Sequence, residues 1–189
     1  MPSNRNLLGK HRVRIAQVIF WLLFIYCFLI ERISTVPLTE ALGITGAAIA
    51  LFGALIRSLS AGYISKNAYL ASRGLYALTR NPLYFGSFMA LTGVNIIIWN
   101  PLFAAVTYFL FALTYIPTIR GEEKSLSLQF TDSWPQFKAS TPRFFPAFWR
   151  ISAYREISWN YQQWKRNGEY RGMVVVILII ALLGWYGSL

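Results

Sequence analysis

Residues 83–119 decide the fold: they read LYFGSFMALTGVNIIIW, then a single Asn100, then PLFAAVTYFLFALTYIPTI. Each half is apolar and close to the length of about 20 residues that a helix needs to cross a bilayer. Proline is favoured at the first position of a helix, and Trp99-Asn100-Pro101 is typical of a tight turn. The stretch therefore predicts a hairpin of two antiparallel membrane-spanning helices, 83–99 and 101–119.

Three further stretches have the same character: 13–30, 38–56 and 173–186, the last of which reaches spanning length only with its flanks. The 189 residues are 56% hydrophobic and only 13% charged, whereas roughly a quarter of the residues of a soluble domain are charged. The lone Cys27 excludes a disulfide framework and a multi-cysteine metal site. We therefore expect an all-α integral membrane protein with about five transmembrane helices, folded as one membrane domain over residues 1–189.

The basic residues show which ends of these helices share a side of the membrane. Four lie before the first span or at its edge, where Arg14 stands, and one follows it. Four lie between the second and third spans, none lies in the hairpin, and nine lie between 120 and 171. By the positive-inside rule, the N-terminus and both long polar segments are cytoplasmic and the C-terminus is outside. The net charge of +11 is then a topology signal that also suits anionic lipids, and no nucleic-acid partner is expected.

The two polar segments contain the residues that could bind a ligand or take part in a reaction. The first ends in SRGLYALTRNPLY at 72–84, where Pro82 suits a helix start and Arg80 suits an anion at the positive end of that helix. The second begins IRGEEK at 119–124, with Arg120 and Glu123 three residues apart and hence on one helix face. Arg120 and Glu123 either form an ordinary interfacial ion pair, or a carboxylate of this run accepts hydroxyls or an amine of a cofactor.

The rest of the second polar segment is rich in aromatic residues. TPRFFP at 141–146 is an extended stretch suited to covering a flat ligand. Between 147 and 171 aromatic and charged residues alternate, and one face gathers Ile151, Tyr154, Ile157, Tyr161 and Trp164. That pattern predicts a cytoplasmic amphipathic helix lying on the membrane surface. Residues 147–189 would therefore comprise an interfacial helix and the last transmembrane helix.

The ordered set of motifs resembles the isoprenylcysteine carboxyl methyltransferase and phospholipid N-methyltransferase superfamily. The matching residues are GLY at 74–76, RNPLY at 80–84, the hairpin at Asn100, RGEE at 120–123, Leu126, Phe130 and PRFFP at 142–146. The resemblance covers about residues 60–146, which would form the methyltransferase-like core. Asn81 stands where the family usually has His, and Thr131, Trp134 and Phe137 replace the usual Gly, Tyr and Tyr.

The resemblance implies an S-adenosylmethionine-dependent membrane methyltransferase with a lipophilic or lipidated substrate, acting on an isoprenylcysteine carboxylate-like or phospholipid-like acceptor. Its cofactor pocket would be built from the two cytoplasmic segments. Arg120 and Glu123 would be the catalytic residues, with Arg120 orienting the acceptor or the cofactor. No metal is implied. The implied cofactor-binding residues are Tyr76, Arg80, Asn81, Pro82, Tyr84, Glu122 and Glu123.

Methyl transfer does not require a catalytic histidine. The sulfonium carries the reactivity and the protein mainly aligns donor and acceptor. When a carboxylate attacks a sulfonium, the opposite charges cancel in the transition state, so a water-poor site favours the reaction without a general base. An amine acceptor would first have to be neutral.

Two other functions remain open. Membrane sterol reductases, which use NADPH, share the same core pattern and end in a run that Asp132-Ser-Trp134 faintly echoes. A non-enzymatic transporter subunit or scaffold would place more polar residues in the spans. Gly86, Ala90 and Gly93 instead suggest close helix packing, and Asn95 fits a packing hydrogen bond and a pocket equally well.

Overall fold

The computed structural model describes residues 15, 18–26, 28, 34–63, 70–150 and 159–188. Within these ranges the chain forms helices and loops and no strand, as expected for an all-α protein. The long helices are α2 (Ala41–Ala61), α4 (Pro82–Ile98), α5 (Pro101–Gln129) and α8 (Tyr170–Tyr186), and the short ones are α3 (Leu75–Leu78), α6 (Trp134–Ser140) and α7 (Tyr161–Asn167). Residues 18–26 are also helical.

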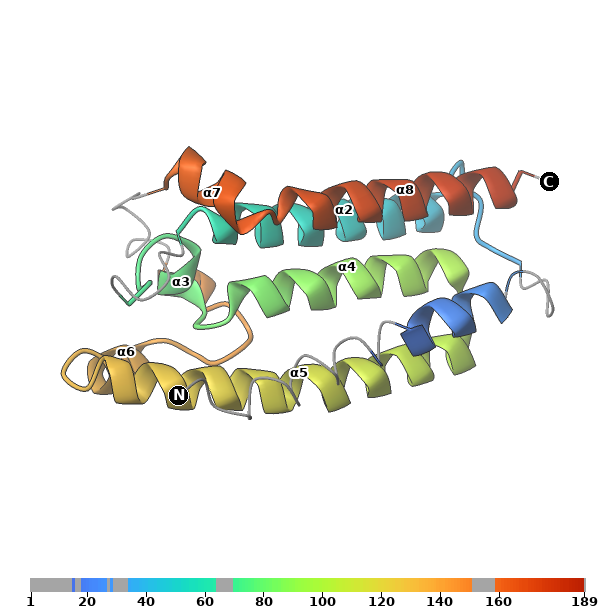
Figure 1. Ribbon diagram of the computed structural model, residues 1–189. Coiled ribbons are helices and arrows are strands. Elements are labelled where there is room, and N and C mark those ends of the chain that lie inside the picture. Colours follow the sequence, from blue (N-terminus) through green and yellow to red (C-terminus); the bar gives the residue numbers. More distant parts are fainter. Residues whose placement is uncertain are drawn as a thin grey trace.

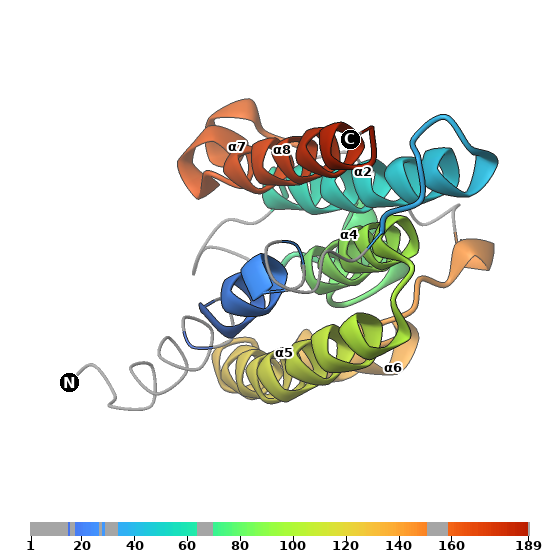
Figure 2. The ribbon, with the colours of Figure 1, turned by 90° about the vertical axis from the view of Figure 1, so that its right-hand side faces the viewer.

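The long helices run side by side and alternate in direction. α2 and α8 form one layer, α4 lies beneath them, and α5 packs on the far side of α4 (Figures 1 and 2). The short helices α3, α6 and α7 gather at the end where α2 and α5 finish and α4 begins (Figure 1). The two polar segments therefore meet at the same end of the bundle.

The hairpin forms where the sequence predicts it. Trp99 ends α4 in the left-handed conformation with φ 47°, and Pro101 is the first residue of α5. The Asn100 side chain caps α5, because its Oδ1 accepts a hydrogen bond of 2.8 Å from the backbone N–H of Phe103. These local preferences reverse the chain within two residues.

α2 and α4 approach so closely that glycine is required at their contact. A Cβ added to Gly53 would lie 2.4 Å from the backbone nitrogen of Ala90, and one added to Gly93 would lie 2.3 Å from that of Ala50. Gly86 faces Gly53 in the same way, because a Cβ added to Gly86 would lie 2.6 Å from the carbonyl oxygen of Gly53. The expected role of Gly86, Ala90 and Gly93 in close helix packing is confirmed.

The core joins all the long helices with the N-terminal helical residues. Phe24, Ile97, Phe103 and Leu183 belong to one buried cluster. Asn95, also buried, exchanges hydrogen bonds of 3.1 and 3.2 Å with the Thr107 hydroxyl on α5. The Asn95 side chain therefore forms a hydrogen bond that helps α4 pack against α5.

Among the described residues, two helices, α2 and α5, are long and apolar enough to cross a membrane. α7 with α8 would make a third if their 65° bend lies within one span. The count of five spans and the sides of the termini remain predictions, and α4 is a shorter apolar helix.

A single continuous amphipathic helix over 147–171 is not formed. Among the described residues of this range, 148–150 form one short turn, 159–160 are irregular, and Tyr161–Asn167 are helical as α7. Gly168, with φ 68°, then ends α7 before α8 begins. The expected face residues Ile151, Tyr154 and Ile157 lie outside the described residues.

Candidate active site

A polar cavity of about 520 Å³ opens at the end of the bundle where the two polar segments meet. Side chains from α2, α3, α4, α5 and the α7–α8 turn all contribute to its wall. Its lining consists of Arg57, Ala61, Leu70, Ala71, Tyr76, Arg80, Asn81, Leu83, Tyr84, Glu122, Ser125, Leu126, Gln129, Phe130, Phe137, Asn167 and Glu169.

Gly74 places Tyr76 in this wall. Gly74 has φ 59°, a conformation that favours glycine, and a Cβ there would lie 2.4 Å from the ring of Tyr63. The turn leads directly into α3, where Tyr76 is only 8% exposed. Burial raises the pKa of the Tyr76 phenol, Glu122 and Glu169 raise it further, and Arg57 lowers it. Tyr76 therefore presents a neutral hydroxyl.

Glu123 lies behind the wall and ties three residues together. Its Oε1 is 3.2 Å from Arg80 Nε, and its Oε2 accepts a hydrogen bond of 3.0 Å from Arg143 Nε. Asn81 Nδ2 donates to Oε1 at 3.3 Å. The Arg80 side chain is 7% exposed and that of Glu123 10%, so this ion pair is largely removed from water. The Arg80 Nε–H makes no hydrogen bond of good geometry with a described residue, whereas Nη1 of the same side chain donates to the carbonyl of Lys138 at 3.1 Å.

A backbone clamp joins the two polar segments around this ion cluster. The backbone N–H of Arg80 donates to the carbonyl of Pro142 at 2.9 Å, and the Thr79 hydroxyl donates to the carbonyl of Phe144 at 2.9 Å. Phe144 packs its ring against Phe85 and Phe88 of α4. The stretch 141–146 was expected to cover a flat ligand; it packs here instead and lines neither cavity.

Two further polar pairs stand in the cavity wall. The Tyr84 hydroxyl donates to Glu122 Oε1 at 2.7 Å, joining α4 to α5. Arg57 Nε donates to Glu169 Oε2 at 2.7 Å, joining α2 to the start of α8. Both pairs therefore fix carboxylates from separate helices at the surface of one cavity.

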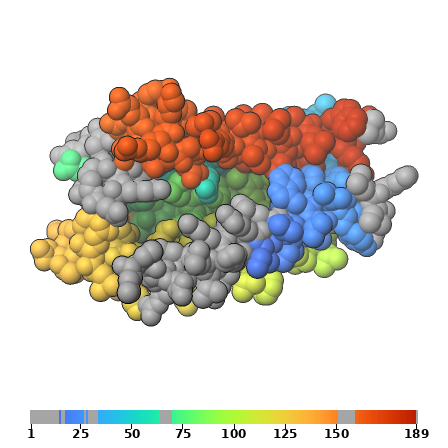
Figure 3. Space-filling model, in the orientation of Figure 1, coloured from blue at the N-terminus to red at the C-terminus, as the bar shows by residue number. Residues whose placement is uncertain are grey.

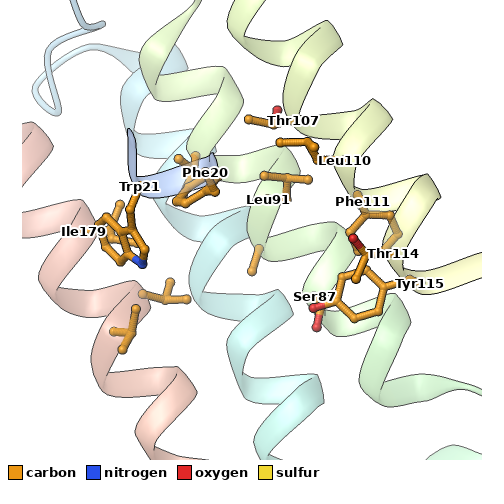
Figure 4. A pocket seen from close by; sticks show the side chains of 14 residues that line it. Phe20, Trp21, Ser87, Leu91, Thr107, Leu110, Phe111, Thr114, Tyr115 and Ile179 are labelled. Atoms are coloured by element: carbon orange, nitrogen blue, oxygen red, sulfur yellow. The ribbon is translucent and has the colours of Figure 1, made fainter. Parts of the chain in front are cut away.

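An apolar groove of about 270 Å³ lies alongside, nearer the middle of the helices. Figure 4 shows Phe20 and Trp21, Ile179 of α8, Leu91 of α4 and Phe111 of α5 pointing into it. In Figure 3, α4 is visible only in the recess beneath α8. The lining is Phe20, Trp21, Ser87, Ala90, Leu91, Val94, Thr107, Leu110, Phe111, Thr114, Tyr115, Val175, Val176 and Ile179.

The groove and the polar cavity adjoin. Ser87 of the groove accepts a hydrogen bond from Arg57 Nη1 of the cavity. Tyr115 of the groove packs against Tyr84 of the cavity, with ring centroids 5.2 Å apart. The groove and the polar cavity are therefore neighbouring sites whose walls are in contact.

The predicted site residues divide into two groups. Five line the polar cavity: Tyr76, Arg80, Asn81, Tyr84 and Glu122. The other three do not: Glu123 is buried in the ion cluster, Pro82 is buried at the first turn of α4, and Arg120 is exposed on α5 outside both cavities. Glu123 pairs with Arg80 and Arg143 and not with Arg120.

Three charged residues of the site were not identified from the sequence: Arg57, Arg143 and Glu169. In the sequence, Arg57 is one of the four basic residues between the second and third spans, and Glu169 belongs to no motif. One signal in the sequence could have paired Arg57 with Glu169. Arg57 directly follows the second span, Glu169 shortly precedes the last span, and both lie on the same predicted side of the membrane. Arg143 was quoted only as part of the aromatic stretch.

Comparisons with known proteins give one family and two relatives that carry other names. A family model described as phospholipid methyltransferase matches residues 19–133. The cobalt-zinc-cadmium resistance protein CzcN of Cupriavidus metallidurans is 32% identical over 163 residues, covering 82% of this chain and 71% of that protein. The nickel-cobalt-cadmium resistance protein NccN of Alcaligenes xylosoxydans xylosoxydans is 31% identical over 161 residues, covering 81% and 71%. No solved structure gives a significant match.

Proposed function

Because this chain belongs to the phospholipid methyltransferase family, we propose that it is an S-adenosylmethionine-dependent membrane methyltransferase with a lipophilic acceptor. The observation that carries the proposal is the polar cavity adjoining an apolar groove. A soluble cofactor and a lipid need different environments that meet at one point, and this pair of cavities supports such an arrangement.

The lining of the polar cavity fits the cofactor. Its volume of about 520 Å³ lies within the range of about 300–1,000 Å³ usual for small-molecule sites. Arg57, Glu122 and Glu169 offer charges of both signs to an amino-acid moiety and a ribose, while Phe130 and Phe137 offer apolar surface to a flat base. When bound, S-adenosylmethionine supplies a methyl group on an electrophilic sulfonium.

The chain itself would align the acceptor and exclude water. The groove would hold the apolar part, and the head group would enter between the Arg57–Ser87 and Tyr84–Tyr115 contacts. A carboxylate acceptor, as in isoprenylcysteine, needs no general base, while the amine of a phospholipid must first be neutral. In this proposal Glu123 positions the Arg80 side chain. Arg120 is exposed and takes no part in the reaction.

The basic segments support a cytoplasmic active site in a multi-pass protein. The relatives' names point to cobalt, zinc, nickel and cadmium resistance. We propose that any such role of this chain acts through a methylated membrane component. Glu122, Glu123 and Glu169 each already hold a tyrosine or arginine partner, which disfavours them as a shared metal site.

The purified chain in lipid nanodiscs is expected to bind S-adenosylhomocysteine and to transfer a radiolabelled methyl group from S-adenosylmethionine into extracted membrane lipid. Glu122→Gln should weaken the binding of S-adenosylhomocysteine by about tenfold or more, because a hydrogen bond to a charged group contributes about 1.5–3 kcal/mol. Asp132→Asn, at an exposed acid, is the control and should behave as wild type. A folded wild-type protein that binds NADPH and not S-adenosylhomocysteine would establish the reductase alternative.

Leu91→Trp is expected to fill the groove, in which Leu91 is a lining residue. The rate of methyl transfer should then require at least about tenfold more lipid extract for half-saturation, while the Kd for S-adenosylhomocysteine stays within twofold, a difference of about 0.4 kcal/mol. Leu102→Trp adds the same volume at a site that is 73% exposed and should leave both values unchanged. Equal loss of lipid and nucleoside affinity in Leu91→Trp would contradict separate sites.

A further inference from the structure

The C-terminal part of the chain completes the polar cavity although it lies beyond the family match, which ends at residue 133. Trp164 Nε1 of α7 donates to the Ser58 hydroxyl at 2.8 Å, and Asn167 Nδ2 donates to the carbonyl of Ala61 at 2.7 Å. These bonds hold α7 against the end of α2. The turn at Gly168, with φ 68°, then delivers Glu169 into the cavity wall.

Glu169 shares one side of the cavity with Tyr76 and Glu122. Both carboxylates lie close enough to Tyr76 to raise the pKa of its phenol beyond the effect of burial. The Tyr76 side chain is more than nine-tenths buried, lines the cavity, and has no hydrogen-bond partner for its hydroxyl among the described residues. Because Tyr76 is part of the cavity wall, its hydroxyl is available to a ligand in the cavity.

The charges on this side favour a cation. Arg57 offsets Glu169 at 2.7 Å, and Glu122 has only the neutral Tyr84 hydroxyl as its partner in the described part of the chain. Among Arg57, Glu169, Glu122 and Tyr84, one negative charge is therefore left without a cationic partner. Arg57 donates to Oε2 of Glu169 and Tyr84 donates to Oε1 of Glu122. The other oxygen of each carboxylate makes no side-chain hydrogen bond within the described part of the chain.

We propose that Glu169, together with Glu122 and Tyr76, forms a subsite for a primary ammonium group. The three N–H donors of an ammonium match the two remaining carboxylate oxygens and the Tyr76 hydroxyl. The ammonium belongs either to the methionine moiety of the cofactor or to an amine head group of the acceptor; this choice of ligands rests on the proposed function. The C-terminal extension is thus part of the binding site and not only a membrane anchor.

The test compares three probes on the full chain in nanodiscs, wild type and Glu169→Gln: S-adenosylhomocysteine, 5′-methylthioadenosine, which lacks the amino-acid part, and dodecylamine. We expect Glu169→Gln to weaken the binding of S-adenosylhomocysteine by about tenfold or more and to leave the affinity for 5′-methylthioadenosine unchanged. Loss of dodecylamine affinity with unchanged S-adenosylhomocysteine would assign the ammonium to the acceptor. Glu40→Gln, at an exposed acid on the far end of α2, is the charge-matched control.

Three results overturn the subsite: equal weakening of both nucleosides, no change with any of the three probes, or recovery of wild-type affinity in the double variant. The double variant Arg57→Gln/Glu169→Gln leaves no unpaired Arg57 charge, so it shows whether lost binding reflects a stranded guanidinium instead of the missing carboxylate. A wild-type protein that binds dodecylamine through Glu169 but neither nucleoside would overturn the proposed function and retain the subsite.

Discussion

Glu123→Ala is expected to lower the free energy of unfolding by about 3 kcal/mol and to abolish binding of S-adenosylhomocysteine. Removing one partner of a buried ion pair typically costs about 3–5 kcal/mol, because the remaining charge is stranded away from water. Here the stranded charge is Arg80, whose side chain is 7% exposed. Arg143 is half exposed and can be hydrated, so the lower end of that range applies. Thermal unfolding and equilibrium binding measure the two effects.

A double variant separates loss of the ion pair from loss of packing. In Arg80→Met/Glu123→Leu both charges are replaced by apolar side chains, and a large part of the lost stability should return. Nucleoside binding should not return, because Arg80 lines the cavity. If Glu123→Ala unfolds within about 0.5 kcal/mol of wild type, the buried cluster does not hold the two polar segments together.

Gly53→Ala is expected to lower the free energy of unfolding by about 2–3 kcal/mol. The new Cβ would lie 2.4 Å from the backbone nitrogen of Ala90 and 2.5 Å from the carbonyl oxygen of Gly86. Backbone atoms cannot rotate away as a side chain can, so α2 and α4 must separate, and overpacking of this kind costs about 1–3 kcal/mol. The apparent Tm in detergent should fall by about 5–10 °C.

Gly121→Ala is the matched control, because the same substitution meets nothing within 4 Å on α5. Alanine is favoured over glycine in a helix by about 1 kcal/mol, so this variant should be as stable as wild type or slightly more stable. If both variants melt together, the close approach of α2 to α4 is not a source of stability.

The elements of the fold follow closely from local sequence. Apolar length sets α2 and α5, and Asn100 with Pro101 sets the turn between α4 and α5. The amphipathic segment was predicted less well, because a helical pattern of aromatic residues says nothing about Gly168, whose left-handed conformation ends α7.

The site was predicted in part for the same reason. Tyr84 and Glu122 belong to motifs with a recognisable spacing, and both line the polar cavity. Arg57 and Glu169 are 112 residues apart, and only the folded structure shows that they form a pair in the cavity wall. Glu123 looked equivalent to Glu122 in the sequence, yet successive helix residues point about 100° apart, so one faces the cavity and the other the ion cluster.

The sequence by itself determined that this is a helical, basic, membrane-embedded chain, that residues 83–119 fold back on themselves, and to which family the chain belongs. Hydrophobic length, turn chemistry and motif order are properties of neighbouring residues, so no tertiary contact is needed to infer them. The tertiary structure decided which charges face each other across helices: Arg80 with Glu123, and Arg57 with Glu169. Such pairs depend on helix rotation and on the glycine-controlled approach of α2 to α4, which bring together residues that no local pattern connects.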